Sequence, residues 1–518
     1  MRRSRRILLG VLGVGLISIV AILFWALVLF NPTHHRDRIS DWIQTHTGVE
    51  MVFEGPIALD VGFPSDAFLG LSVGIQSATI RSISGVMPSQ PMTINRFSVA
   101  FSLEDLRRVL RGEGMRAEGM FDVAEIDIRT LTTDLAIDWS IFLPQAFRHA
   151  QGKGRFEIND DRIRLFDLDL MLSSTPIKGW AMVDSWRTEP EIAFDLQIPE
   201  LEMSNMMPLE TQSFMDGLVL VNLPAFSLAS LNATGHLAID QLRSGGMRMT
   251  EVKIPIRSKA GGVVSSPITA QLYGGSARID SIMQVSSEGM SLGSVQRLEK
   301  IAVGDALEDL DVTDVVESEA DLEIVLSFSG ADLESGLEAL RGAIVIDGKP
   351  GRIKGIDVER LIEQLVEQSS NKGDWQGEGA STPINGLIAT ARIENGAVTN
   401  RDLALRVANL DTRGYGRYDF VSEQINYRLF LSLQNSKVAK SLPPPLNSGL
   451  LVLPLQVSGT RQSPAATIDM TTFLQMQFNH MMGGPSPIKP PAKDPVVLGL
   501  AEQLRADISA RIKAAATQ

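Results

Sequence analysis

The sequence predicts a mainly β protein (α+β) carried by one N-terminal membrane helix. A run of 24 residues without a charge, Ile7–Phe30, lies near the start of the chain. Beyond it, 44 glycines and 25 prolines accompany an aromatic content of only 6%, which favours short strands joined by turns over a helical bundle. Apolar and polar residues alternate in several segments, most clearly in Ile425–Gln434, which indicates strands with one apolar side.

The apolar run is long enough to cross a bilayer, because a helix of this length reaches about 36 Å and a hydrocarbon core is ~30 Å thick. It is too long for a cleaved signal peptide, and the bulky Phe30 and then Asn31-Pro32 follow where small residues would mark a cleavage site. Four arginines within residues 1–6 should stay cytoplasmic. We therefore expect residues 1–6 to be a cytoplasmic basic tail and residues 7–30 to be the transmembrane anchor, with the remaining chain outside the cytoplasm.

The charge and the cysteine content exclude several classes of function. The net charge is −13 even though the N-terminal tail is basic, so the rest of the chain would be repelled by a phosphate backbone, and nucleic acid is not an expected partner. The chain has no cysteine, which rules out disulfides and thiolate metal sites and agrees with an oxidising compartment.

The first half of the chain after the anchor reads as one short helix followed by strands. Arg36–Gln44 has the pattern of an amphipathic helix, and the segment after it is broken by Gly55-Pro56 into two expected strands. A short helix is expected over Ser102–Gly112. The acidic stretch Glu299–Glu319 has broken periodicity and predicts a loop or a short helix.

Residues 154–285 are expected to be almost entirely strand and turn. Asn159-Asp160-Asp161 predicts a turn. After it, apolar residues alternate with a slip of one position, so that the apolar set is Ile163, Leu165, Leu168 and Leu170.

The C-terminal part combines two expected helices with a strand meander. Helices are expected over Asp332–Leu340 and after Asp357, and a Gly/Ser-rich loop over Asn371–Thr382. Asn395-Gly396 is a strong hairpin signal. The strands expected after it are Asp402–Ala408, Arg413–Phe420, Ile425–Gln434 and Leu451–Ser458.

The tail leaves the sheet. A Met-rich helix is expected over Phe473–Met482, and a proline-rich linker follows it. A last amphipathic helix should carry on one side Val497, Leu500, Leu504, Ile508 and Ile512.

No motif predicts an enzyme, a cofactor or a metal site. Gly70–Gly74 matches G-x-S-x-G, but a nucleophile elbow needs a helix after the serine, and a strand pattern follows here. We expect no activity to depend on Ser72. His34-His35 could bind a metal weakly, but adjacent side chains point apart and no second cluster completes the site.

The sequence resembles the AsmA-like family in four segments. Residues 47–61 (TGVEMVFEGPIALDV) resemble its opening strand pair, and residues 237–280, which contain Tyr273-Gly274-Gly275, resemble its central strand block. Residues 339–365 and 389–433 are similar to its C-terminal module, and residues 453–470 to its closing strand and turn.

The resemblance implies an inner-membrane-anchored, single-pass periplasmic protein whose antiparallel sheet forms an elongated, taco-shaped groove. Residues 31–335 would form the N-terminal and central part of the groove, residues 336–470 the C-terminal AsmA-like module, and residues 471–518 the Met/Pro-rich tail with its terminal helix. The groove would carry phospholipid in outer-membrane biogenesis. The candidate groove residues are Leu403, Leu405, Ile425, Tyr427, Leu429, Leu431 and Leu433.

Two alternatives stay open from the sequence. Alternation is equally typical of an ordinary sheet whose apolar side packs on the protein's own helices. The chain could also be a membrane-anchored scaffold that binds outer-membrane or periplasmic assembly proteins and no lipid.

Overall fold

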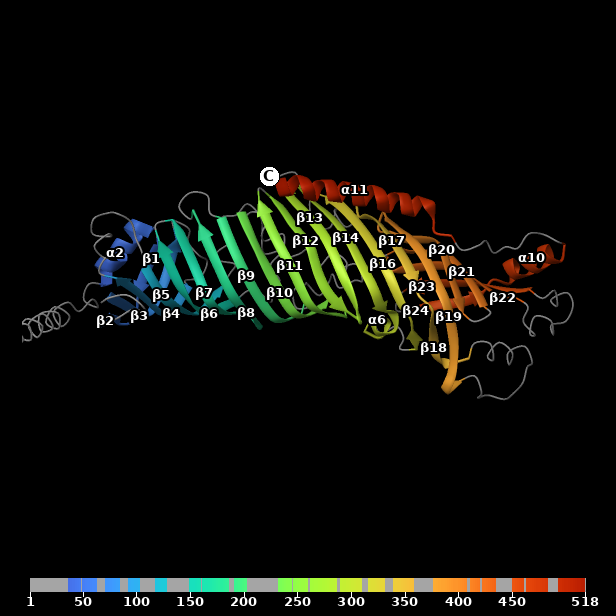
Figure 1. Cartoon of the computed structure of the whole chain (residues 1–518), viewed down its shortest axis with the longest axis horizontal. Coiled ribbons are helices and arrows are strands. Elements are labelled where there is room, and N and C mark those ends of the chain that lie inside the picture. The colour runs from blue at the N-terminus through green and yellow to red at the C-terminus, as the bar shows by residue number, and fades with distance from the viewer. Residues whose placement is uncertain are drawn as a thin grey trace, which may run out of the picture. The chain divides into compact units, whose positions relative to one another are not determined.

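The computed structural model describes the greater part of the chain after residue 35. The described residues are 36–47, 49–62, 70–83, 92–102, 117–127, 149–159, 161–185, 191–202, 232–244, 246–259, 261–286, 289–309, 315–330, 339–357, 376–407, 410–419, 422–434, 450–460, 463–482 and 492–517. The chain divides into two compact units, Met1–Gln197 and Ile198–Gln518. The first unit is coloured blue to green and the second green to red in Figure 1.

The first unit is an antiparallel sheet preceded by a short helix. β1 and β2 both pair with β3, each with a different half of it, and the strands then pair in chain order to β9, which ends in the second unit. The elements are α2 (Arg36–Thr47), β1 (Val49–Phe53), β2 (Ile57–Gly62), β3 (Gly70–Ile83), β4 (Met92–Ser102), β5 (Ala117–Asp127), β6 (His149–Asn159), β7 (Arg162–Leu172), β8 (Thr175–Asp184) and β9 (Glu191–Glu202).

The second unit is a longer antiparallel meander with three described helices. Its strands pair from β10 to β14 in chain order, then through β16, β17, β19 and β20 to β24, while β15 and β18 form a short branch on β19. The strands are β10 (Asn232–Ser244), β11 (Met247–Lys259), β12 (Gly262–Leu272), β13 (Gly275–Ser286), β14 (Gly289–Ala302), β15 (Val316–Glu317), β16 (Glu319–Gly330), β17 (Arg341–Gly348), β18 (Gly351–Ile356), β19 (Gln376–Glu394), β20 (Ala397–Val407), β21 (Leu410–Asp419), β22 (Gln424–Gln434), β23 (Leu450–Thr460) and β24 (Ser463–Ile468). The helices are α6 (Val303–Asp309), α10 (Met470–Met481) and α11 (Pro495–Thr517).

The expected membrane helix Ile7–Phe30 lies outside the described residues, as does the helix expected after Asp357. The helices expected over Ser102–Gly112 and Asp332–Leu340 also lie outside them except at Ser102, which ends β4, and at residues 339–340, which are not helical. Within the described part of the chain, no helix is both long and apolar enough to span a membrane.

Most of the other expected elements are confirmed. The two strands around Gly55-Pro56 form, and the acidic stretch after Ala302 contains the short helix α6. Asn395 and Gly396 have φ values of 52° and 69°, the positive pair that a type I′ hairpin turn requires, between β19 and β20. Tyr273 and Gly274 repeat this geometry between β12 and β13, with φ values of 47° and 72°.

The prediction of a loop over Asn371–Thr382 is wrong from Gln376 onward. Residues 376–384 are the first part of β19 and pair with β18 between Gly351 and Ile356. Their glycine- and serine-rich composition hides the strand because main-chain hydrogen bonds to a neighbouring strand do not depend on side-chain alternation.

The slip in the alternation of β7 is a β-bulge. The pairing of β7 with β8 shifts between Leu165 and Leu168, and Asp167 has a φ of 52°. Similar shifts occur in β11 at Glu251 and in β14 at Lys300, each with a positive φ. Two residues an odd number of positions apart normally point to opposite sides of a sheet. Because a bulge adds one residue to its strand, the apolar residues before and after the bulge point to the same side.

Helix α11 packs across the strands of the second unit (Figure 1). Val497, Ala501, Leu504 and Ile508 form one buried cluster with strand residues, and Leu500 and Ile512 pack against it, as the helical periodicity predicts. The strand residues of the cluster are Ile282, Val295, Val325 and Ala343. Arg505 adds an ion pair with Glu323, with Nη2 and Oε2 2.8 Å apart.

Helix α6 is tied to the sheet by a polar cluster. Arg248 donates two hydrogen bonds to the carboxylate of Asp309 at 2.8 and 2.7 Å, and the Tyr273 hydroxyl donates a third at 3.0 Å. The bonds from Arg248, and then that from Tyr273, lower the pKa of Asp309 against an opposing effect of burial. Burial is the main cause that raises the pKa of Tyr273 to about 12.

The contacts of α11 predict different effects for neighbouring valines. Val497 is 4% exposed and Val496 is 59% exposed. Val497→Ala should lower the free energy of unfolding of the second unit by about 2 kcal/mol through lost burial and a residual cavity. Val496→Ala, which changes helix propensity equally, should change it by less than about 0.5 kcal/mol. Denaturant titration followed by circular dichroism measures both, and equal effects would contradict the packing.

The lowered pKa of Asp309 predicts acid lability at α6. A carboxylate whose pKa is lower in the folded state contributes stability above its unfolded pKa, and loses it as the pH falls through the folded value. Amide hydrogen exchange of Val303–Asp309, corrected for intrinsic rates, should therefore speed up below about pH 4. Asp309→Asn should be less protected at pH 7 and should lose most of this pH dependence. If the α6 amides of the variant were as well protected from exchange at pH 7 as those of the wild type, the contact of Asp309 with Arg248 and Tyr273 would not stabilise the helix.

Candidate functional site

The alternation in β22 separates apolar from polar side chains as the sequence predicts. Ile425, Tyr427, Leu429 and Leu431 are half-buried, whereas Gln424, Asn426 and Arg428 are exposed. Residues that are paired directly across antiparallel strands lie on the same side of a sheet. The cross-strand pairs therefore show which residues of the neighbouring strands share a side with Tyr427 and Leu429.

The candidates on β20 share that side. Leu403 and Leu405 pair with Gly414 and Thr412 of β21, and these pair in turn with Leu429 and Leu431 of β22. For Leu433 the structure gives the backbone position, paired with Leu410 and Leu451. The pairings thus assign all of the sequence candidates to one side, which we call the apolar side of the second unit.

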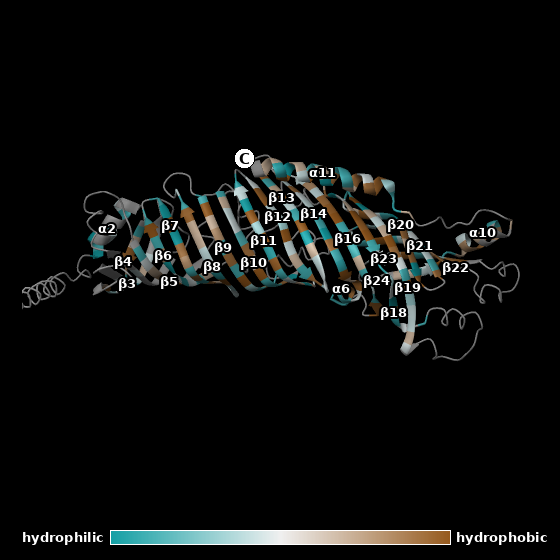
Figure 2. Ribbon diagram, in the orientation of Figure 1, coloured by the Kyte–Doolittle hydropathy of each residue, from teal (hydrophilic) through white to brown (hydrophobic). Residues whose placement is uncertain are grey.

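The apolar side extends over the strands from β10 to β23. Among the described residues that the pairings place on it, none is charged. Residues on it that the sequence analysis did not single out include Val252, Ile254, Ile268, Ile279, Met283, Leu292, Leu326 and Phe328, all buried. The same alternation marks them, but bulges interrupt it within β11, β12 and β14, so the pattern is hard to follow in the sequence. Figure 2 shows hydrophobic and hydrophilic residues alternating along these strands.

The other side of the sheet, which we call the helix side, carries α11. Val325 of the helix cluster alternates along β16 with Ile324 and Leu326, which lie on the apolar side. Gly293 also faces the helix, since a Cβ there would lie 2.8 Å from Ile508. The longest described helix therefore packs on the side opposite to the candidate residues.

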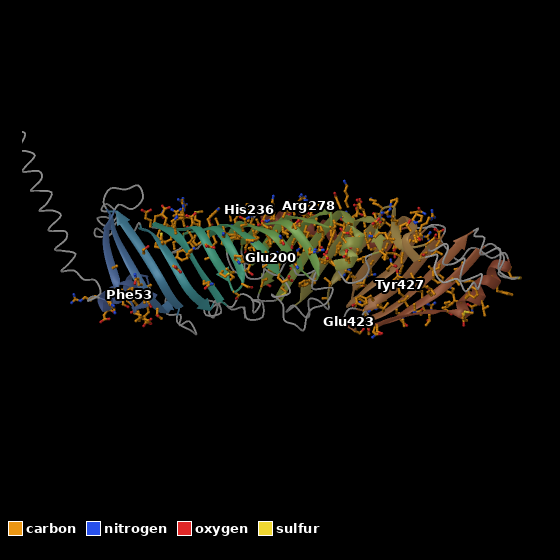
Figure 3. All side chains as sticks on the ribbon, turned by 90° about the horizontal axis from the view of Figure 1, so that it is seen from below. Phe53, Glu200, His236, Arg278, Glu423 and Tyr427 are labelled. Carbon is orange, nitrogen blue, oxygen red and sulfur yellow. The ribbon has the colours of Figure 1, made fainter. Side chains whose placement is uncertain are left out.

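The charged residues of the second unit that the described strand pairings assign to a side lie on the helix side. Arg278 pairs with Arg297 and Thr269, and His236 pairs with Pro255. In Figure 3 His236 and Arg278 lie along the row of side chains that projects beyond the ribbon, whereas Tyr427 lies over the ribbon.

The polar tip of Tyr427 has partners within the sheet. Its hydroxyl donates to Oδ1 of Asn400, and the Asn400 amide donates to the carbonyl of Thr390 and to Asp402, both at 2.8 Å. Burial raises the pKa of Tyr427, so the ring stays neutral. The only phenol among the candidates is therefore both uncharged and hydrogen-bonded, which makes it compatible with an apolar neighbour.

Glycines on β21 make room for the large side chains of β22. A Cβ on Gly416 would lie 2.4 Å from Cδ2 of Tyr427 and 2.5 Å from the carbonyl oxygen of Asn426. A Cβ on Gly414 would lie 2.8 Å from side-chain carbons of Leu429 and Tyr427. The ring of Tyr427 thus lies over the backbone of its neighbour, an arrangement that protects a glycine within a strand.

The first unit has an apolar side of its own. Leu165, Leu168 and Leu170 share it with Phe156 and Phe194, as the pairings of β6 to β9 show. Gly119 pairs with Phe156, and a Cβ there would lie 2.6 Å from the phenyl ring. The same combination of glycine and aromatic ring thus recurs in this unit.

The described residues contain no arrangement that points to catalysis at the sequence candidates. Ser72 lies within β3 and pairs with Asp60 and Ala100, so Gly70–Gly74 is continuous strand. In the described part of the chain, no group of three or more His, Asp or Glu residues could hold a metal ion. His34-His35 lies outside it. The surface that remains is an uncharged, mainly apolar sheet side, which also includes the buried polar residues Ser265, Ser281, Ser294 and Gln296.

Comparison with known proteins agrees with the resemblance found in the sequence. The model of the AsmA family matches residues 229–403. The chain is 22% identical over 380 residues to "Protein AsmA" of Escherichia coli (strain K12), an alignment that covers 67% of this chain and 60% of that protein. The chain thus spans about 60% of the length of this relative. No solved structure matches the chain.

The glycines of β21 predict a graded effect of substitution. Gly416→Ala should lower the free energy of unfolding by about 1–3 kcal/mol, because the added methyl group meets a backbone oxygen as well as a ring. Gly414→Ala should cost less than about 1 kcal/mol, since the ends of flexible side chains can move. Denaturant titration of both variants tests this order, and a larger effect at Gly414 would contradict it.

Proposed function

We propose that this chain, which is similar to AsmA-family proteins, has an envelope-related role, namely the transport of phospholipid with acyl chains held against the apolar side of its sheet. One observation carries the proposal. The pairings place no charged residue on the apolar side from β10 to β23 among the described residues, and α11 packs on the opposite side.

The energetics of lipid extraction support such a surface. A 16-carbon acyl chain exposed to water costs on the order of 12 kcal/mol, at ~0.8 kcal/mol per methylene. A continuous apolar surface removes most of this cost at each position of the chain. A single charge on the surface would add the cost of its own desolvation, so the absence of charge matters as much as the presence of leucine and isoleucine.

A partly exposed region of the apolar side, on β22, is the proposed entry for lipid. Ile425, Tyr427, Leu429 and Leu431 are half-buried, whereas Leu292 and Leu326 are 1% and 0% exposed. The side chains of β22 can therefore be reached from solvent, and an acyl chain on them would complete their burial. A groove-shaped sheet would enclose the chain from both flanks.

The proposed topology follows from the same role. Ile7–Phe30 anchors the protein in the inner membrane with the N-terminus in the cytoplasm, and the two units lie in the periplasm. The acidic net charge of −13 then keeps the body from lying flat on an anionic bilayer, so the sheet can stand away from its own membrane. No catalytic residue, metal or cofactor takes part, and lipid moves down a gradient maintained elsewhere.

A pair of charge insertions in one strand tests the proposal. The full-length protein should co-purify with phospholipid, measured by mass spectrometry of an organic extract. Leu429→Asp should reduce the bound phospholipid about tenfold or more, because a carboxylate would then lie beside the acyl chain. Asn426→Asp places the same charge on the exposed helix side of β22 and should leave the phospholipid unchanged.

The outcomes separate the alternatives. A wild-type protein without phospholipid would favour a scaffold that binds assembly proteins. Equal losses in both variants would mean that charge or folding, and not the apolar side, causes the effect. Circular dichroism of both variants shows whether the sheet is intact.

A further inference from the structure

Helix α10 leaves an apolar stripe in solvent at the end of the second unit's sheet. Met470, Leu474, Phe478 and Met482 are 56%, 61%, 61% and 73% exposed. They recur every four residues, so they lie along one side of the helix. Such large side chains on a helix are normally covered, and here a row of them is not.

The opposite side of α10 holds the helix on the sheet. α10 contacts β23, and the half-buried Phe473 and Met476 lie on that side of the helix. Asp469 caps the helix, since it accepts hydrogen bonds from the backbone N–H of Thr472 at 3.0 Å and from its hydroxyl at 2.5 Å, and its own N–H donates to the carbonyl of Pro454 at 3.0 Å. The cap lowers the pKa of Asp469. The exposed stripe is therefore presented by a fixed helix.

The stripe continues the apolar side of the sheet. Ile468, the last residue of β24, is 51% exposed and pairs with Leu455. Leu455 pairs with Leu429, so both lie on the apolar side. Met470 follows Ile468 after one capping residue. The surface that is proposed to hold acyl chains thus leads directly into the stripe.

The composition of the helix favours a bilayer as its occupant. Met470–Met481 contains no Lys, Arg, Asp or Glu in a chain of net charge −13. Protein interfaces are usually anchored by Trp, Tyr or Arg, and none of these is present in α10. Flexible methionine and leucine side chains with an uncharged Thr/Gln/Asn flank suit insertion among lipid chains.

We infer that α10 docks the end of the sheet on a lipid bilayer, with Met470, Leu474, Phe478 and Met482 inserted at the boundary between headgroups and acyl chains. This inference rests on the proposed function, since a sheet that carries phospholipid needs a membrane at its end to supply or receive it. Because the helix is uncharged, binding depends on apolar insertion and not on the charge of the headgroups.

The test uses the full-length protein in lipid nanodiscs, mixed with protein-free vesicles and separated by flotation. One set of vesicles contains phosphatidylethanolamine and phosphatidylglycerol, and the other phosphatidylcholine alone. The wild-type protein should float with both sets, with little change when salt is added. Leu474→Asp/Phe478→Asp should reduce flotation about tenfold or more, since carboxylates are excluded from the hydrocarbon.

A matched double variant controls for charge. Gln475→Asp/Asn479→Asp adds the same two charges to the same helix with the same spacing, outside the stripe, and should float like the wild type. Wild-type flotation of the stripe variant would overturn the inference. So would flotation that requires anionic lipid and disappears in salt, or a stripe that proves to join two copies of the chain, seen as a change in oligomeric state without vesicle binding.

The phospholipid content of the purified proteins, measured before they are placed in nanodiscs, separates this inference from the proposed function. The stripe variant should keep its bound phospholipid, whereas Leu429→Asp should lose phospholipid and still float. A wild-type protein that floats without carrying phospholipid would overturn the proposed function alone.

Discussion

The whole structure depends on the two-residue period of the β-strand. Every property of the apolar side requires that apolar residues of one strand face the same way as those of the next. A shift of one residue would move the whole set of a strand to the other side. Over strands of eleven or more residues, such as β7 and β11, bulges at Asp167 and Glu251 restore the phase after each extra residue. The residues at the bulges are polar, so the irregular positions lie outside the apolar set.

The different composition of the two sides of the second unit follows from this two-residue period. Charged residues collect on the helix side, where α11 adds its own burial through Leu504 and Ile508. Ile282, Val295 and Val325 form an apolar patch on this side, and the helix packs on that patch. A helix seated on the apolar side would bury the residues that the proposed function requires. The location of α11 leaves β22 accessible.

Among the described residues, charged groups are kept off the apolar side, and the polar residues on it are neutral, among them the buried Ser265, Ser281, Ser294 and Gln296. Tyr427 is hydrogen-bonded to Asn400, and Arg248, Tyr273 and Asp309 are joined at the strand ends beside α6. An unpaired polar group on the apolar side would be costly against a hydrocarbon chain. These hydrogen bonds therefore support the proposed binding of acyl chains. Glycines such as Gly416 serve the same purpose, because they let a large ring lie over the neighbouring backbone.

The sequence alone was sufficient to predict the strand meander, the Asn395-Gly396 hairpin, the apolar set of β22 and the face of α11, because each of these depends on local periodicity or turn chemistry. The one-residue slip in the apolar alternation before Leu168 could also be seen in the sequence, but only the pairing of β7 with β8 shows that it is a β-bulge. The strand at Gln376–Thr382 and the side on which α11 packs depended on contacts between segments far apart in the chain. Periodicity tells which residues of a helix or strand face together, but only the pairing of neighbours decides what they face.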